Sequence, residues 1–238
     1  MIAKQLFEAG RVTEAIQALS GYLRDHPADI RQRTFLFELL CFAGQFERAE
    51  KQLGVLAQGG GQTEMGAVLY YSALHGERTR LETFEKAAFP EKSPQPASSF
   101  QGTLNGKPFT SITDADPDLG TRLEVFAAGA YLWIGFEHIA SIEIQPPTRL
   151  RDTLWLPASV TTGPSFQGTE LGEVLIPVLY PSSFKHPDES VWLGRQTAWG
   201  ADSNGTEYPS GQKVFLVDGE EVPLLDVRSL QFAEAPAA

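Results

Sequence analysis

Three aspartates at alternate positions are the part of the chain that most resembles a chemical site. Asp114, Asp116 and Asp118 are spaced like the first ligands of a calcium-binding loop, in which carboxylates converge on a hard cation. The rest of the loop does not match, because Leu119 stands where glycine is needed and Val125 where a bidentate glutamate is needed. We therefore predict no metal and no cofactor, and these aspartates are the one candidate kept against that prediction.

The alternative for this segment is an acidic turn whose carboxylates accept backbone N–H groups or pair with an arginine. The candidate arginines are Arg122, Arg149 and Arg151. The last two lie in a stretch of alternating charge, 149–155, that ends in a tryptophan. That stretch could hold an anion or the acidic turn, but we favour the start of a strand with an internal ion pair.

Other reactive side chains are not arranged for catalysis. The four histidines are scattered, without a zinc-binding spacing, and the single Cys41 is expected to pack in a core. Ser182, Ser183, His186 and Asp188 crowd one segment, whereas triad members usually converge from distant segments. The chain also lacks a nucleophile elbow and a phosphate-binding glycine loop. We predict that the protein is not an enzyme.

The elements that position these residues begin with a repeat of 34 residues. The residues that recur at this spacing are small or apolar: Gly10, Ala15, Leu19 and Tyr22 return as Gly44, Ala49, Leu53 and Leu56. This is the period of the tetratricopeptide repeat, a helix–turn–helix unit that stacks into a curved peptide-binding surface. In a third, less regular unit Leu74 fits the pattern, but Arg78 replaces the glycine.

The composition changes near residue 90. We expect helices over 2–9, 12–25, 29–43, 46–57, 63–75 and 78–88. A Pro- and Ser-rich linker follows at 90–99, and short β-branched and aromatic segments occupy 100–238. Asn105-Gly106 and Asp218-Gly219 are strong hairpin turns, and a short helix is expected near 137–141. The predicted class is α+β: tetratricopeptide-like helical hairpins (domain 1–89) followed by a mainly antiparallel β domain (100–238).

The helical part also predicts a binding groove. In tetratricopeptide geometry one side of each first helix faces the concave surface, and apolar residues flanked by charges suit an amphipathic helix. Some of these side chains could instead be covered by the β domain. The groove candidates in this register are Lys4, Phe7, Arg31, Thr34, Glu38, Phe42, Met65 and Val68.

Charge and hydropathy exclude several classes of partner. Residues 1–89 carry ten Lys/Arg and eleven Asp/Glu, whereas residues 90–238 carry nine and nineteen. An acidic chain without a basic tract is unsuited to nucleic acid or to anionic membranes. No apolar run is long enough to span a bilayer, and a single cysteine cannot form an intrachain disulfide. We expect a cytoplasmic protein.

Several motifs in order resemble one known family. The helical half has Arg33-Thr34-Phe35-Leu36-Phe37-Glu38-Leu39-Leu40-Cys41 and Gly44-Gln45-Phe46-Glu47-Arg48-Ala49. The other half has DADPDLGTRLEV at 114–125, YLWI at 131–134, LRDTLWLPA at 150–158, IPVLYPSS at 176–183 and Thr197-Ala198-Trp199. Together they resemble the ImpE/TagJ (SciE-type) family of accessory proteins of bacterial type VI secretion.

The resemblance implies a cytoplasmic, non-enzymatic adaptor that is related to virulence functions. It implies binding to the N-terminal helix of the small contractile-sheath subunit, and action beside the ClpV-type ATPase that recycles the sheath. It identifies no contact residues. Two alternatives remain: a generic tetratricopeptide co-chaperone or peptide-binding scaffold, and an enzyme or calcium-regulated module built on the acidic turn.

Overall fold

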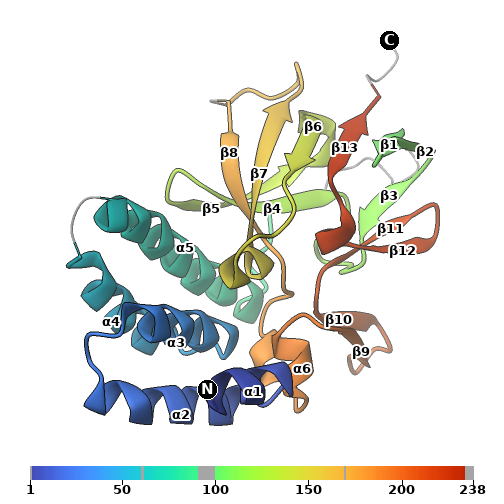
Figure 1. Ribbon diagram of the computed structural model, residues 1–238. Helices are drawn as coiled ribbons and strands as arrows, with labels where there is room; N and C mark the ends of the chain where they lie inside the picture. The colour runs from blue at the N-terminus through green and yellow to red at the C-terminus, as the bar shows by residue number, and fades with distance from the viewer. Residues whose placement is uncertain (1, 60–61, 91–99, 169, 234–238) are drawn as a thin grey trace.

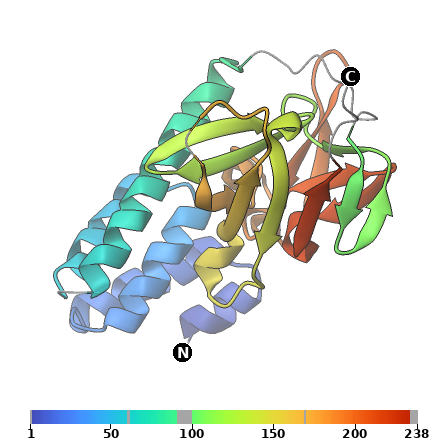
Figure 2. The same ribbon diagram turned by 90° about the horizontal axis from the view of Figure 1, so that it is seen from above.

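The computed structural model describes residues 2–59, 62–90, 100–168 and 170–233, with backbone alone for 62–65. Helices occupy the first part of the chain and strands the second, and Figure 2 shows them on opposite sides of the molecule. This confirms the predicted α+β class. Nearly all of the predicted linker, 91–99, lies outside the described residues, so the proposed division into domains stays a prediction.

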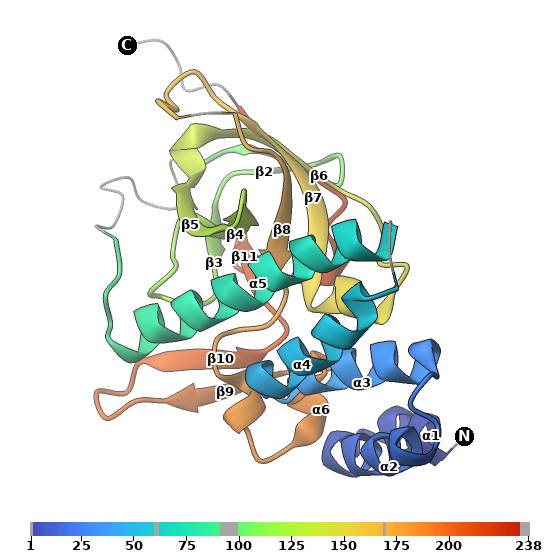
Figure 3. The same ribbon diagram turned by 90° about the vertical axis from the view of Figure 1, so that its left-hand side faces the viewer.

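Five helices make up the N-terminal part (Figure 1). The first four form two antiparallel hairpins, and the fifth crosses the face of the large sheet, as Figure 3 shows. The helices are α1 (Ile2–Glu8), α2 (Val12–Asp25), α3 (Ile30–Phe42), α4 (Phe46–Ala57) and α5 (Gln62–Glu85).

The 34-residue repeat produces the same turn twice. Gly10 and Gly44 have φ values of 75° and 64°, a left-handed conformation that glycine adopts without steric cost. At each turn the residue after the glycine donates its N–H to the carbonyl five residues back, which is the Schellman ending of a helix. Ala15 and Ala49 are fully buried in the first turn of the second helix of each hairpin, where their small side chains let the helices approach closely.

The prediction of two helices over 63–88 is wrong, because α5 runs through without a break. Arg78 stands in place of the turn glycine and forms an ion pair with Glu50 on α4. Gly76 lies where the break was expected, and a Cβ atom there would come within 2.6 Å of the Phe126 ring. The glycine therefore allows close packing of α5 on the sheet, and the third hairpin does not form.

The C-terminal part consists of three antiparallel sheets. The largest has the order β2-β1-β13-β6-β7-β8-β4-β5, the second β12-β11-β3 and the third β10-β9. The strands of the first are β1 (Gly102–Leu104), β2 (Lys107–Phe109), β4 (Arg122–Ala127), β5 (Ala130–Gly135), β6 (Ile139–Ile144), β7 (Trp155–Thr162), β8 (Gly172–Pro177) and β13 (Ser229–Phe232). The others are β3 (Ile112–Asp114), β9 (Thr197–Ala201), β10 (Glu207–Gly211), β11 (Val214–Val217) and β12 (Glu220–Pro223).

Both predicted hairpin turns are confirmed. Asn105 and Gly106 join β1 to β2 with φ values of 51° and 76°, and Asp218 and Gly219 join β11 to β12 with 51° and 86°. Two successive positive φ values are the geometry that matches the twist of a hairpin. The helix expected near 137–141 is a single 3-10 turn at Phe136–His138, after which β6 begins.

A buried polar network attaches α5 to the sheet. The guanidinium of Arg80 donates two hydrogen bonds to the Glu124 carboxylate, at 2.7 and 2.8 Å, and a third to the Leu179 carbonyl at 2.8 Å. The ammonium of Lys213 and the hydroxyl of Tyr131 also contact Glu124. Burial alone would raise the pKa of Glu124, but the charges and hydrogen bonds of Arg80 and Lys213 hold it low, at about 2.

Aromatic packing continues the same interface toward α3. The Trp155 ring at the start of β7 lies 5.9 Å from the Tyr70 ring and 6.4 Å from the Phe37 ring. One cluster of buried apolar side chains extends through both parts of the molecule. Among the described residues, no helix has the length and apolar character needed to cross a membrane.

Candidate functional site

A groove between the first helices of the two hairpins brings together five of the eight predicted residues. Lys4 and Phe7 come from α1, and Arg31, Thr34 and Glu38 come from α3. The groove has a volume of about 590 Å³. Its remaining lining residues are Gln32, Phe35 and Leu150.

The apolar wall of this α1–α3 groove is an aromatic pair. The rings of Phe7 and Phe35 meet edge to face, with their centroids 5.5 Å apart. The guanidinium of Arg195 lies 5.0 Å from the Phe7 ring centroid and donates to the Phe7 and Glu8 carbonyls at 2.8 and 2.9 Å. A residue of the C-terminal part thereby holds the last turn of α1 in place, because those carbonyls have no partner within the helix.

The base of the groove is an ion pair. Glu38 accepts a hydrogen bond of 3.1 Å from Arg151, whose guanidinium lies 4.9 Å from the centre of the Tyr70 ring. Burial raises the pKa of Glu38, and Arg151 opposes that shift. Arg151 lies in a 3-10 turn, Leu150–Thr153, in which Asp152 accepts the backbone N–H groups of Thr148 and Arg149.

The segment 149–155 therefore contributes Leu150 to the groove and Arg151 to the ion pair with Glu38, which the sequence did not indicate. The predicted internal ion pair is replaced by the contact between Arg151 and Glu38, which are 113 residues apart in the chain. Leu150 lines the groove and was not among the predicted residues. The alternating charges were the one available signal, but their partner could not be identified without the fold.

Positive charge lies on the rim. Lys4 is exposed and forms a solvent-facing ion pair with Glu8 at 3.6 Å. Arg31 is also exposed and has no ion-pair partner within the part of the chain that the structure describes. An aromatic wall with cations at its edge is suited to the apolar face of a helix that carries acidic residues beside it.

The other predicted groove residues do not lie here. Phe42 is 2% exposed and belongs to the core, so its assignment to a binding surface is corrected. Val68 is 61% exposed and lines a separate hollow between α5 and the sheet, with Leu69 and Phe126. The side chain of Met65 lies outside the described residues. Phe42 was misplaced because α3 is buried on all sides from Leu36 onward, so periodicity cannot show which face meets the groove.

The acidic segment is a turn, as the alternative interpretation predicted. Asp114 accepts the N–H of Asp116 and Asp116 accepts the N–H of Asp118, both at 2.8 Å. Asp114 pairs with Lys213 at 3.5 Å and accepts from the Tyr180 hydroxyl at 3.0 Å, whereas Arg151 contacts Glu38 instead. Among the described residues, no group of three or more acidic, histidine or cysteine side chains is placed to hold a metal ion.

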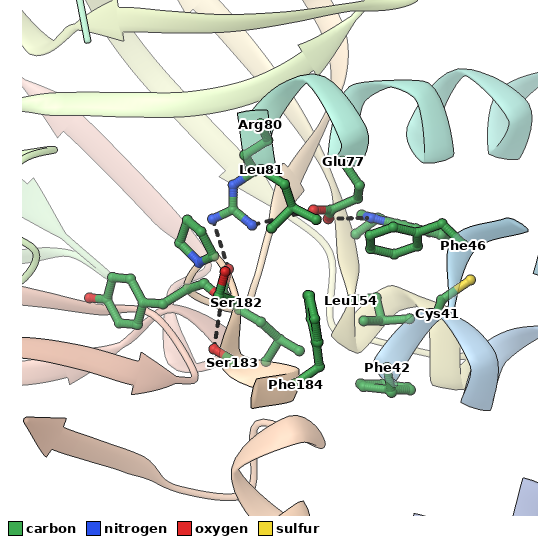
Figure 4. Close-up of a pocket in the computed structure, with 14 residues that line it drawn as sticks. Cys41, Phe42, Phe46, Glu77, Arg80, Leu81, Leu154, Ser182, Ser183 and Phe184 are labelled. Carbon is green, nitrogen blue, oxygen red and sulfur yellow. Dashed lines mark hydrogen bonds and ion pairs between the residues drawn. The ribbon is translucent and has the colours of Figure 1, made fainter. Parts of the chain in front are cut away.

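The serine-rich segment has structural hydrogen bonds. The Ser183 hydroxyl donates to the Tyr180 carbonyl at 2.6 Å and accepts the Gly211 N–H at 2.8 Å. Asp188 caps the short helix α6 (Glu189–Trp192). The neighbouring cavity in Figure 4 has a volume of about 30 Å³, which is room for little more than one water. Cys41 beside it is buried, and burial raises its pKa.

Comparison with known proteins finds relatives that match nearly the whole chain. The protein is 31% identical to the type VI secretion system accessory component TagJ of Pseudomonas aeruginosa, over an alignment that covers 100% of this chain and 93% of the relative. Its fold is similar to the crystal structure of protein VPA1032 from Vibrio parahaemolyticus, with a TM-score of 0.85, 22% identity and 98% of both chains covered.

The family match is centred on the strands. The sequence profile of the ImpE protein family matches residues 106–231, which begin at the turn between β1 and β2 and end in β13. The relative extends the similarity over the helical part, including α1 and α3. On these two findings, the chain belongs to the ImpE family, whose member TagJ is an accessory component of type VI secretion.

Proposed function

We propose that this protein is a non-enzymatic, cytoplasmic adaptor of type VI secretion. Its α1–α3 groove binds the N-terminal helix of the small contractile-sheath subunit, and the protein acts beside the ClpV-type ATPase that recycles the sheath. The observation that carries the proposal is the convergence of five predicted groove residues on one open surface. Family membership supports the pathway, and the groove supports the kind of partner.

The shape and chemistry of the groove favour a helix over an extended peptide. Phe7 and Phe35 offer a compact aromatic surface, and none of the described residues that line the groove belongs to a strand. An amphipathic helix presents apolar residues at intervals of three and four, which such a surface can receive. Acidic residues beside that apolar stripe would lie near Lys4 and Arg31, and a basic residue would lie near Glu38.

Isothermal titration with a peptide that spans the sheath helix tests the proposal. The full-length protein is expected to bind with micromolar or tighter affinity. The double variant Lys4→Glu/Arg31→Glu should bind about tenfold more weakly, because two rim cations become anions. Phe7→Ala should also weaken binding, because it removes an aromatic anchor from the groove wall.

Lys51→Glu is the matched control, since Lys51 is an exposed lysine on α4 that does not line the groove. It should bind like the unmodified protein. Circular dichroism of each variant and of the peptide shows that the partners are folded or can form a helix. Unchanged affinity in both groove variants would contradict the assignment of the groove as the binding site. No binding of the peptide by the unmodified protein would contradict the assignment of the sheath helix as the partner.

A further inference from the structure

Another hollow lies between the C-terminal end of α5, residues 181–182 and strand β10, in the region where Figure 3 shows β10 below α5. Its volume is about 320 Å³, and it shares no lining residue with the α1–α3 groove. The residues that line it include one buried carboxylate and no basic side chain: Phe84, Glu85, Asp116, Pro181, Ser182, Tyr208, Pro209 and Ser210.

Asp116 is the unusual member of this pocket. It is 5% exposed, and one carboxylate oxygen accepts the N–H of Asp118 at 2.8 Å. The other oxygen has no hydrogen-bond partner among the residues that the structure describes. This second oxygen is not one of the fully buried side-chain atoms that lack a partner, so it is accessible from the hollow that Asp116 lines.

The charges around Asp116 do not supply the missing partner. Lys213 is committed to Asp114 and Glu124, and Glu85 at the pocket edge is paired with Lys185 at 3.2 Å. Asp114 and Asp118 add negative charge, and burial raises the pKa of Asp116 to about 6. The pocket is therefore electronegative at its base and is suited to a cation from outside the chain.

The walls indicate which cation. Two aromatic side chains, Phe84 and Tyr208, and two prolines, Pro181 and Pro209, provide flat surfaces, whereas Ser182 and Ser210 provide hydroxyl acceptors. In the described part of the chain, no group of three or more acidic, histidine or cysteine side chains is placed to hold a metal ion, so this lining does not favour a divalent metal. A guanidinium is planar, is weakly hydrated, stacks on aromatic and flat apolar surfaces, and pairs with carboxylates through several N–H donors.

We propose that this pocket binds the side chain of an arginine from a protein partner, with the guanidinium paired to the free oxygen of Asp116 and stacked beside Phe84 and Tyr208. The exposed Trp199, whose cross-strand neighbour is Pro209, adds apolar surface on the same two-stranded ribbon for the residues that flank the arginine. The site shares no lining residue with the α1–α3 groove and would give the protein a second region of contact with a partner.

The probe is Nα-acetyl-arginine methylamide, titrated into the full-length protein at pH 8 and followed by nuclear magnetic resonance. The comparison probes are the citrulline analogue, which is nearly isosteric but neutral, and the lysine analogue, which carries an ammonium. We expect saturable millimolar binding of the arginine probe, and at least about tenfold weaker binding of the other two. Asp116→Asn should weaken arginine binding by a similar factor, because the amide keeps the acceptor for the Asp118 N–H but loses the charge.

Glu220→Gln, which neutralises an exposed carboxylate on β12, should leave binding unchanged. Equal binding of the citrulline and arginine probes to the unmodified protein would overturn the proposal without any variant. So would unchanged binding in folded Asp116→Asn, or the absence of saturable binding. Equal binding of the lysine probe would overturn the preference for a guanidinium.

Discussion

Two contacts between the helical part and the C-terminal part each contain an arginine paired with a glutamate beside aromatic rings, but their surroundings differ. Between α5 and the sheet, the side chains of Arg80 and Glu124 are 2% and 0% exposed, and further donors complete the network. Beside the α1–α3 groove, the side chains of Arg151 and Glu38 are 17% and 9% exposed, and Glu38 borders the open volume. The same chemical pair is sealed in one interface and lies beside an open groove in the other.

This difference distinguishes a closed interface from an open surface. In a tetratricopeptide array the first helix of each hairpin faces the concave side, and here the two first helices, α1 and α3, line the open groove. We therefore expect substitutions in the interface of α5 with the sheet to change stability, and substitutions in the α1–α3 groove to change binding.

The largest effect is expected from Arg80→Met. The substitution leaves the Glu124 carboxylate fully buried with Lys213 as its one remaining cation. Breaking a buried pair in this way costs about 3–5 kcal/mol of unfolding free energy, measured by urea denaturation. Lys86→Met, directly after the same helix, is the control, because the ion pair of Lys86 with Glu82 is exposed and should contribute less than about 0.5 kcal/mol. Equal effects of the two variants would contradict the comparison.

The variant Phe42→Ala tests whether Phe42 acts in the core or in the α1–α3 groove. Phe42 packs beside the cavity of Figure 4, so truncation should create a void and cost about 3 kcal/mol of stability. Affinity for the sheath peptide, measured under conditions where the variant is folded, should remain that of the unmodified protein. Phe7→Ala should show the reverse pattern, with a small loss of stability and a clear loss of affinity. Weaker peptide binding by folded Phe42→Ala would show that Phe42 contributes to the binding surface after all.

Asp116 gives a prediction with a defined pH dependence. Its folded pKa of about 6 lies above its ordinary value of 3.8, so the protonated carboxyl favours the folded state, and this stability is lost as pH rises from about 4 to 6. Lys213 opposes the shift, and Asp114 and Asp118 add to it. Asp116→Asn should therefore be more stable than the unmodified protein at pH 8, by up to about 3 kcal/mol, and similar to it near pH 4.

Thermal unfolding at several pH values measures this difference. A constant difference between the two proteins from pH 4 to 8 would show that Asp116 does not titrate in this range. Addition of the arginine probe at pH 8 should raise the melting temperature of the unmodified protein and narrow its gap to Asp116→Asn, since a ligand of the folded state stabilises it.

The smallest effect on stability is expected from Arg151→Met. Water reaches this pair, and the raised pKa of Glu38 makes its protonation easier once the arginine is removed. The loss should be about 1–2 kcal/mol in urea denaturation, well below that of Arg80→Met. A loss of unfolding free energy equal to that of Arg80→Met would mean that the Arg151–Glu38 pair stabilises the fold as strongly as the interface of α5 with the sheet does.

Features that depend on a few neighbouring residues could be predicted from the sequence. The helix endings at Gly10 and Gly44, and the hairpins at Asn105-Gly106 and Asp218-Gly219, follow from residues that accept a positive φ. The acidic turn also follows, because aspartate side chains bond to backbone N–H groups two residues ahead. The residues of the groove on α1 and α3 could be predicted because the repeat sets their register.

Features that depend on distant segments were decided by the tertiary structure. A glycine at position 76 is compatible with either a turn or a helix that packs closely, and Phe126 on β4 selects the helix. The pairing of Asp114 with Lys213, and of Glu38 with Arg151, joins residues about a hundred positions apart. Local propensity carries no information about such pairs. Chain composition determined which residues could be charged or buried, and the packing of helices on the sheet determined which of them face a partner.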